Sequence, residues 1–171
     1  MLKIAAAALL ITVLAQDMRT RSVSWPVFPL LALCGLGLQW GHGYPPSEVL
    51  MPVSVSLLFL VVQFALVKLY FTLKQGKKVV LADSLIGWGD MAFMACTAFM
   101  LPVLTFILFY MVSLLLVLAG WLLYSRIRKA GGNHIPLAGL QALLLLLLLA
   151  GDWALGCYDL YDDQLFTFLI R

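Results

Sequence analysis

Long apolar runs follow one another along the chain, with short polar stretches between them. The runs cover about residues 2–16, 26–40, 49–73, 89–102, 103–124 and 135–151. Apolar runs of this kind are typical of membrane-spanning helices, which need about 20 predominantly apolar residues each. The pattern therefore predicts an all-α, polytopic membrane protein with about six transmembrane helices.

The overall composition supports this class of protein. Hydrophobic residues make up 64% of the 171 residues and charged residues 11%, and the mean hydropathy is +1.04. Ordinary soluble domains are far more polar, with about 25% charged residues. Six spans with short connectors use nearly the whole length, so we expect one membrane-embedded domain over residues 1–171. The three cysteines are scattered, and we expect neither a zinc site nor a disulfide framework.

Basic residues lie in alternate connectors. The stretches QDMRTRS, KQGKK and SRIRKAGGNH begin at residues 16, 74 and 125, and they follow the first, third and fifth apolar runs. Short loops rich in Lys and Arg stay on the cytoplasmic side of a membrane. These three connectors are therefore predicted to be cytoplasmic, which places both the N-terminus and the C-terminus outside.

The first apolar run has a second interpretation. It contains Lys3, an apolar core and a small residue at Ala15, which is also the composition of a cleaved signal peptide. Arg19 and Arg21 follow the run and outnumber the single lysine before it. This charge balance opposes a signal peptide and favours a span whose N-terminus is outside.

The acidic residues divide between the two predicted sides of the membrane. Of the eight acidic residues, five fall in the predicted outer loop or outer tail: Glu48, Asp152, Asp159, Asp162 and Asp163. Asp17, Asp83 and Asp90 fall on the cytoplasmic side, and we interpret Asp83 as a solvated loop residue or a partner for the neighbouring lysines. Asp17 ends the first run and Asp90 opens the fourth. Their carboxylates are therefore at a similar depth and can meet if those two helices pack together.

Two carboxylates in a poorly solvated site do not both ionise, so one keeps its proton while the other acts as a base. The base takes a proton from a water molecule as that water attacks a peptide carbonyl. The protonated carboxyl stabilises the forming oxyanion and then protonates the leaving amine. Charged residues at a membrane boundary are also functional candidates by default. We therefore predict Asp17 and Asp90 as the catalytic residues of an aspartic peptidase.

The stretch GWGD places Gly89 immediately before Asp90 and Gly87 three residues before it. Gly87 and Gly89 permit backbone conformations that are denied to other residues and let a substrate strand approach closely. We predict that they form the backbone of the active site, with the amides of the following helix near the Asp90 carboxylate. The alternative is a loop that simply ends in an Asp N-cap.

Three stretches resemble the type IV prepilin peptidases, membrane aspartic peptidases with a GxGD motif. QDMRTRSVSWPVF, from residue 16, resembles their first motif, and IGWGDMAFM, from residue 86, resembles the GxGD motif. NHIPLAGLQALL, from residue 133, resembles the Ile-Pro start of their last helix. The resemblance covers about residues 10 to 150, and it maps the two catalytic aspartates of the family onto Asp17 and Asp90.

The resemblance implies a peptidase-only endopeptidase that removes the leader of prepilin-like precursors, in a type IV pilus or protein secretion system. Its site would face the cytoplasm at the boundary of the inner membrane. The expected partners are precursors with a basic leader and an apolar helix, together with the lipid bilayer. No nucleic acid, cofactor or metal is expected. Two alternatives stay open: a noncatalytic scaffold that binds prepilins or supports secretion assembly, and a small transporter whose Asp17 and Asp90 bind a proton or cation.

Overall fold

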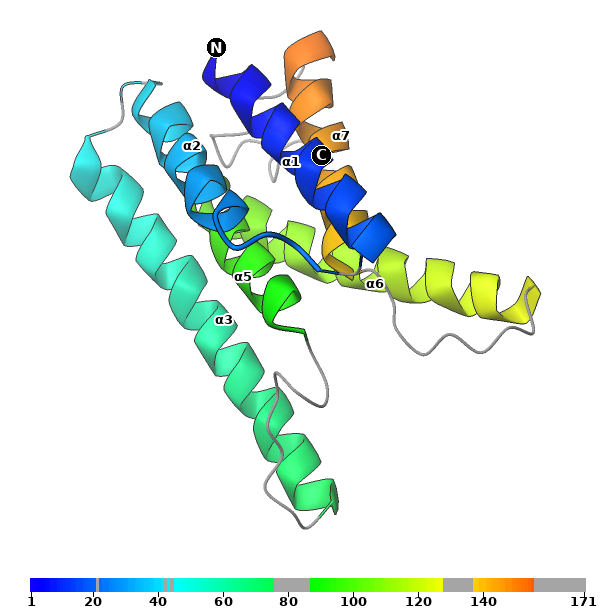
Figure 1. Ribbon diagram of the computed structural model, residues 1–171. Helices are drawn as coiled ribbons and strands as arrows, with labels where there is room; N and C mark the ends of the chain where they lie inside the picture. The colour runs from blue at the N-terminus through cyan, green and yellow to red at the C-terminus, as the bar shows by residue number, and fades with distance from the viewer. Residues whose placement is uncertain (21, 42, 44, 76–86, 128–136, 156–171) are drawn as a thin grey trace.

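The computed structural model describes residues 1–20, 22–41, 43, 45–75, 87–127 and 137–155. In these residues the chain forms helices α1 (Leu2–Thr20), α2 (Val27–Gly41), α3 (Pro46–Gln75), α5 (Trp88–Thr97), α6 (Val103–Ile127) and α7 (Leu137–Leu155) (Figure 1). Each predicted apolar run corresponds to one of these helices, so the all-α prediction is confirmed for the described part of the chain. Asp83 and the acidic residues of the tail, Asp159, Asp162 and Asp163, lie outside the described residues.

Two helices are long and apolar enough to cross a membrane, namely Pro46–Lys74 within α3 and Val103–Gly120 within α6. Val27–Gly41 and Ala138–Trp153 are apolar but shorter. Helix α5 has 10 residues, which is about 15 Å of helix against about 30 Å of bilayer hydrocarbon. The fourth predicted run therefore holds a short helix and a turn instead of one spanning helix. The membrane class is supported by α3 and α6.

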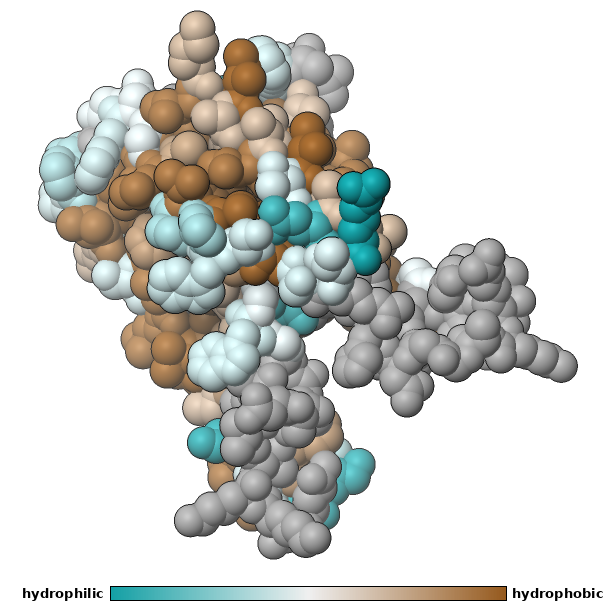
Figure 2. Space-filling view, viewed as in Figure 1, coloured by the Kyte–Doolittle hydropathy of each residue, from teal (hydrophilic) through white to brown (hydrophobic). Residues whose placement is uncertain are grey.

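Apolar side chains cover much of the outer surface of α3 and α6. The exposed apolar residues of α3 include Leu50, Met51, Val55, Leu58, Val61, Val62, Leu66, Leu69 and Leu73, and those of α6 include Leu104, Met111, Val112, Leu115, Leu116 and Leu118. Apolar residues also form much of the described surface in Figure 2. Exposed apolar surface of this extent marks a membrane or protein contact.

Helices α1 and α7 pack side by side and run antiparallel (Figure 1). At one end Lys3 Nζ lies 2.7 Å from Asp152 Oδ2. At the other end the Gly139 amide lies 2.6 Å from Asp17 Oδ2. Asp152 was expected in the outer tail, but it belongs to α7, because this helix continues beyond the apolar run and its carboxylate pairs with a lysine.

Helix α2 is fixed tightly to the end of α5 and the turn that follows it. A Cβ atom at Gly35 would lie 2.7 Å from the Phe99 carbonyl oxygen, so only glycine allows this approach. The Gln39 side-chain amide donates to the same oxygen at 2.9 Å. The Cys96 thiol donates to the Phe28 carbonyl at 3.1 Å. These contacts hold α5, and with it the GWGD stretch, in a set position beside α2.

Candidate active site

Asp17 lies near the C-terminal end of α1 and faces α7. It completes the buried stripe of α1, which consists of Ala6, Leu10, Val13 and Asp17. A spacing of three or four residues places side chains on one face of a helix, so the apolar stripe that packs on α7 carries the carboxylate with it. Asp17 is only 6% exposed, and its Oδ2 accepts a hydrogen bond of 2.6 Å from the Gly139 amide.

Asp90 lies in the first turn of α5. Gly87 is the N-cap of this helix and Asp90 is its third residue, so the alternative of Asp90 as the N-cap residue is wrong. The Asp90 carboxylate interacts with the backbone amide of Gly87 and also reaches beyond its own helix. Its Oδ1 accepts a hydrogen bond of 2.9 Å from the amide of Ala138 in α7.

Helix α7 brings the two carboxylates together. Ala138 and Gly139 are consecutive residues in its first turn, and each donates its amide to one of the two aspartates. Helix α1 packs mainly on α7 and α2, while α5 packs on α2, α7 and α3. Asp17 and Asp90 therefore both lie at the start of α7, as their similar predicted depth allows. They are brought there by their contacts with α7 and not by extensive packing of α1 against α5.

Burial dominates the electrostatics of Asp90, which lies outside the two helices long enough to span a membrane. The pKa of the Asp90 carboxyl is raised to about 6, chiefly by loss of solvent and to a smaller extent by the nearby Asp17 carboxylate. The backbone amides of Ala138 and Gly87 act in the opposite direction, because they favour the ionised form. Asp90 is therefore able to hold a proton in mildly acidic solution, where an ordinary aspartate is ionised.

Gly139 is a site residue that the sequence did not identify. A Cβ atom there would lie 2.9 Å from Asp17 Oδ2 and 3.2 Å from Asp17 Cβ. Real Cβ atoms are essentially never closer than 3.0 Å to other heavy atoms, so any other residue would push Asp17 away from the amide. The stretch IPLAGL contained a signal, because a glycine in the first turn of a helix is unfavourable unless something needs the space.

The two glycines of GWGD do not have the special backbone conformation that was expected of them. Gly87 has φ −64° and ψ 146°, an extended conformation that other residues adopt. The positive φ among the described glycines belongs to Gly43. The conformational argument for Gly87 and Gly89 is therefore wrong. The space beside Gly89 is open, since no atom lies within 4 Å of a Cβ built on this residue. The close approach of a substrate strand there stays a prediction.

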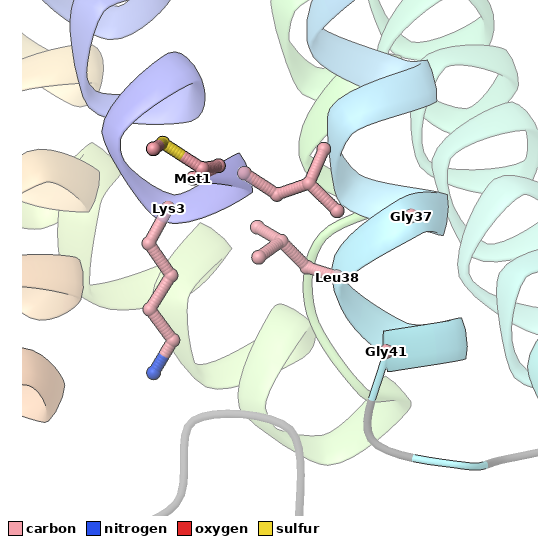
Figure 3. Close-up of a pocket in the computed structure, with 6 residues that line it drawn as sticks. Met1, Lys3, Gly37, Leu38 and Gly41 are labelled. Carbon is pink, nitrogen blue, oxygen red and sulfur yellow. The ribbon is translucent and has the colours of Figure 1, made fainter.

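A pocket opens at the opposite end of α1, away from the aspartates. It is lined by Met1, Leu2, Lys3, Gly37, Leu38 and Gly41. Figure 3 shows the Lys3 side chain extending away from Leu38 and α2, and its amine pairs with Asp152. Among the described residues, no three His, Cys, Asp or Glu side chains are grouped so that they could hold a metal ion. The paired carboxylates are therefore the arrangement with evident chemistry.

Comparison of the chain with protein-family models, with curated proteins and with solved structures gave no match.

Proposed function

We propose that this protein is a membrane aspartic endopeptidase in which Asp17 and Asp90 activate water. One observation carries the proposal: two aspartates from helices far apart in sequence accept hydrogen bonds from consecutive amides at the start of α7. The Asp17 carboxylate is buried, and the pKa of Asp90 is raised. Two carboxyl groups of which one is protonated and the other ionised need such different surroundings.

The roles of the two aspartates follow from their surroundings. Asp90, whose pKa is raised, holds the proton, and its Oδ2 is the oxygen that Ala138 does not bind. Asp17 takes a proton from water as the water oxygen bonds to the peptide carbonyl carbon. The carbonyl electron pair moves to its oxygen, which accepts a hydrogen bond from Asp90. When the carbon–nitrogen bond breaks, the amine takes the Asp90 proton, and proton transfer from Asp17 restores the pair.

The substrate class in this proposal comes from the resemblance to the type IV prepilin peptidases. A prepilin-like precursor has a basic leader followed by an apolar helix. Its cleavage point would lie at the membrane boundary, on the cytoplasmic side of the inner membrane, if both ends of the chain are outside. The apolar surfaces of α3 and α6 support a location in a bilayer. The six-span topology, with the shorter helices also within the membrane, belongs to the proposal.

The hydrogen bonds favour this proposal over a cation transporter. A cation site needs oxygen ligands and a negative potential, whereas the start of a helix presents amide hydrogens and a partial positive charge. Both aspartates face such a start. These donors suit carboxylates that hold and release protons at fixed positions. A noncatalytic scaffold would need neither the pairing nor the buried carboxylate, and it stays the alternative outcome of the experiment below.

The test is cleavage of a coexpressed prepilin-like precursor in membranes. The native chain is compared with Asp17→Asn and Asp90→Asn, and Asp152→Asn is the matched control, because it makes the same change at a buried carboxylate at the other end of α7. All four chains must accumulate to equal levels in the membrane.

We expect the shortened product with the native chain and the control, and its loss in the two dyad variants. Cleavage that persists in Asp17→Asn or Asp90→Asn would remove that aspartate from the mechanism. If the native chain cleaves none of several precursors with basic leaders, the noncatalytic scaffold becomes the better account.

A further inference from the structure

The first turn of α7 has backbone amides that the helix itself does not use. The first four amides of any α-helix have no carbonyl partner within that helix. In α7, the amides of the second and third residues, Ala138 and Gly139, are used by carboxylates from two other helices. Donors that are normally left to solvent or to a capping side chain are here committed to the two aspartates.

Using consecutive amides fixes how far apart the carboxylates lie. Neighbouring Cα atoms are about 3.8 Å apart across a rigid trans peptide, so the two donors cannot move independently. Asp17 and Asp90 come from α1 and α5, which pack on α2 and α7 and not extensively on each other, so their spacing would otherwise change with any shift between α1 and α5. The peptide between Ala138 and Gly139 is therefore the element that sets the distance between the two reacting groups.

Gly139 adds a steric requirement to the hydrogen bond. The 2.6 Å contact between its amide and Asp17 leaves no room for a side chain, since a Cβ would lie 2.9 Å from the same carboxylate oxygen. By contrast, Gly120 lies within α6 with no atom within 4 Å of a Cβ. The requirement at Gly139 thus comes from the carboxylate and is not general to helical glycines in this protein.

We propose that Ala138 and Gly139 are positioning residues, whose amides hold Asp90 and Asp17 at the spacing that peptide hydrolysis needs. This inference rests on the proposed peptidase function, which it deepens. Neither residue touches the reacting atoms through its side chain. Their contribution is made through the backbone, so in IPLAGL only the missing side chain of Gly139 could have indicated it.

The charge on Asp90 gives this role a measurable signature. The Ala138 amide favours the ionised carboxylate and so opposes the effect of burial on its pKa. Ala138→Pro removes this donor, and proline is tolerated in the first turn of a helix because the amide there has no helical partner. A hydrogen bond to a charged group contributes about 1.5–3 kcal/mol, so the pKa of Asp90 should rise by about one unit or more.

The experiment uses the full chain in membranes and two pairs of variants. Gly139→Ala is compared with Gly120→Ala, and Ala138→Pro is compared with Ala138→Gly, which keeps the amide. Cleavage of the precursor is measured for each chain as a function of pH. Protonation of Asp90 is measured separately, by the pH dependence of its labelling with a hydrophobic carbodiimide, located by mass spectrometry with Asp90→Asn as the blank.

We expect Gly139→Ala to lose about tenfold or more of the cleavage rate, because a small displacement of a reacting group is enough for such a loss, while Gly120→Ala keeps the native rate. In Ala138→Pro, the pH at which labelling of Asp90 is half complete should rise by about one unit. In Ala138→Gly, this pH should equal that of the native chain. A native rate in Gly139→Ala, or unchanged labelling in Ala138→Pro, would overturn the inference. If the native chain cleaves no precursor, the peptidase proposal fails, and the labelling still decides whether Ala138 controls the protonation of Asp90.

Discussion

Gly35 offers a sharp test of how the site is held, because it lies where α2 meets the turn after α5. Alanine in place of glycine within a helix normally stabilises by about 0.5–1 kcal/mol. At Gly35 the added carbon would lie 2.7 Å from the oxygen and 2.9 Å from the carbon of the Phe99 carbonyl, and 2.7 Å from Met100 Cγ. The Phe99 atoms belong to the backbone, which cannot rotate away. Gly35→Ala should therefore force α2 and the turn apart.

Gly37, on the same helix, is the matched control. A carbon added there would lie 3.3 Å from Leu2 Cδ1, the end of a flexible side chain that can move by a few tenths of an ångström. The gain in helix propensity is common to both variants and cancels between them. The difference that remains is the overpacking at Gly35, so Gly35→Ala should be about 1–3 kcal/mol less stable than Gly37→Ala.

The assay is reversible unfolding in mixed detergent micelles, with a denaturing detergent as the titrant and far-ultraviolet circular dichroism as the signal. The Gln39 hydrogen bond to the Phe99 carbonyl also ties α2 to the turn after α5, so Gly35→Ala should displace α5 and Asp90 and lower the cleavage rate of the proposed peptidase. Equal unfolding midpoints for the two variants would refute the close packing of α2 on this turn, and with it the argument that α2 fixes the position of Asp90.

Four further outcomes are expected. The kcat/KM of the proposed peptidase should fall as pH rises through about 6, because Asp90 then loses the proton that its proposed role needs; a pH profile that is flat from about 5 to 8 would contradict that role. Lys3→Met should lower the free energy of unfolding by about 1–3 kcal/mol, because Asp152 is left buried without its ion partner, and kcat should be unchanged because this pair is at the far end of α1. Gly89→Ala should accumulate normally, since the added carbon meets open space, but cleave about tenfold more slowly if a substrate strand approaches there; a native rate would exclude that approach. Gln141→Met should leave the free energy of unfolding unchanged or raise it by up to about 1 kcal/mol, since the buried Gln141 Oε1 has no partner in the described part of the chain; a clear loss in the unfolding assay would reveal a partner.

The helices could be predicted because apolar runs and their breaks depend on local sequence. The predicted start and end of α2, at 26 and 40, differ from the observed Val27–Gly41 by one residue each. The predicted boundary between the fourth and fifth segments, after residue 102, agrees with the observed start of α6 at Val103. The end of the helix in the fourth segment was less predictable. An apolar run does not show that this helix ends at Thr97 and that the turn after it packs against Gly35.

The closeness of Asp17 and Asp90 could be predicted from the sequence, and the groups that bind them could not. Asp17 and Asp90 stand out because carboxylates are rare in such a chain. The order of the apolar segments also places both aspartates on the same predicted side of the membrane. Which side of a helix faces a neighbour is a different question, since a run such as the leucines of α7 is apolar all round and its pattern does not define a buried face. The donation by Ala138 and Gly139 is made by backbone atoms, which every residue has, so residue type carries no direct signal for it.

In the proposed peptidase, Asp17 and Asp90 act as one catalytic unit at the start of α7. The most direct measurement compares cleavage rates of Asp17→Asn, Asp90→Asn and the double variant in one membrane preparation. Groups that act as a unit are strongly non-additive, so each single variant should lose about as much activity as the double variant. Losses that multiply in the double variant, or a single variant that cleaves at the native rate, would contradict the account.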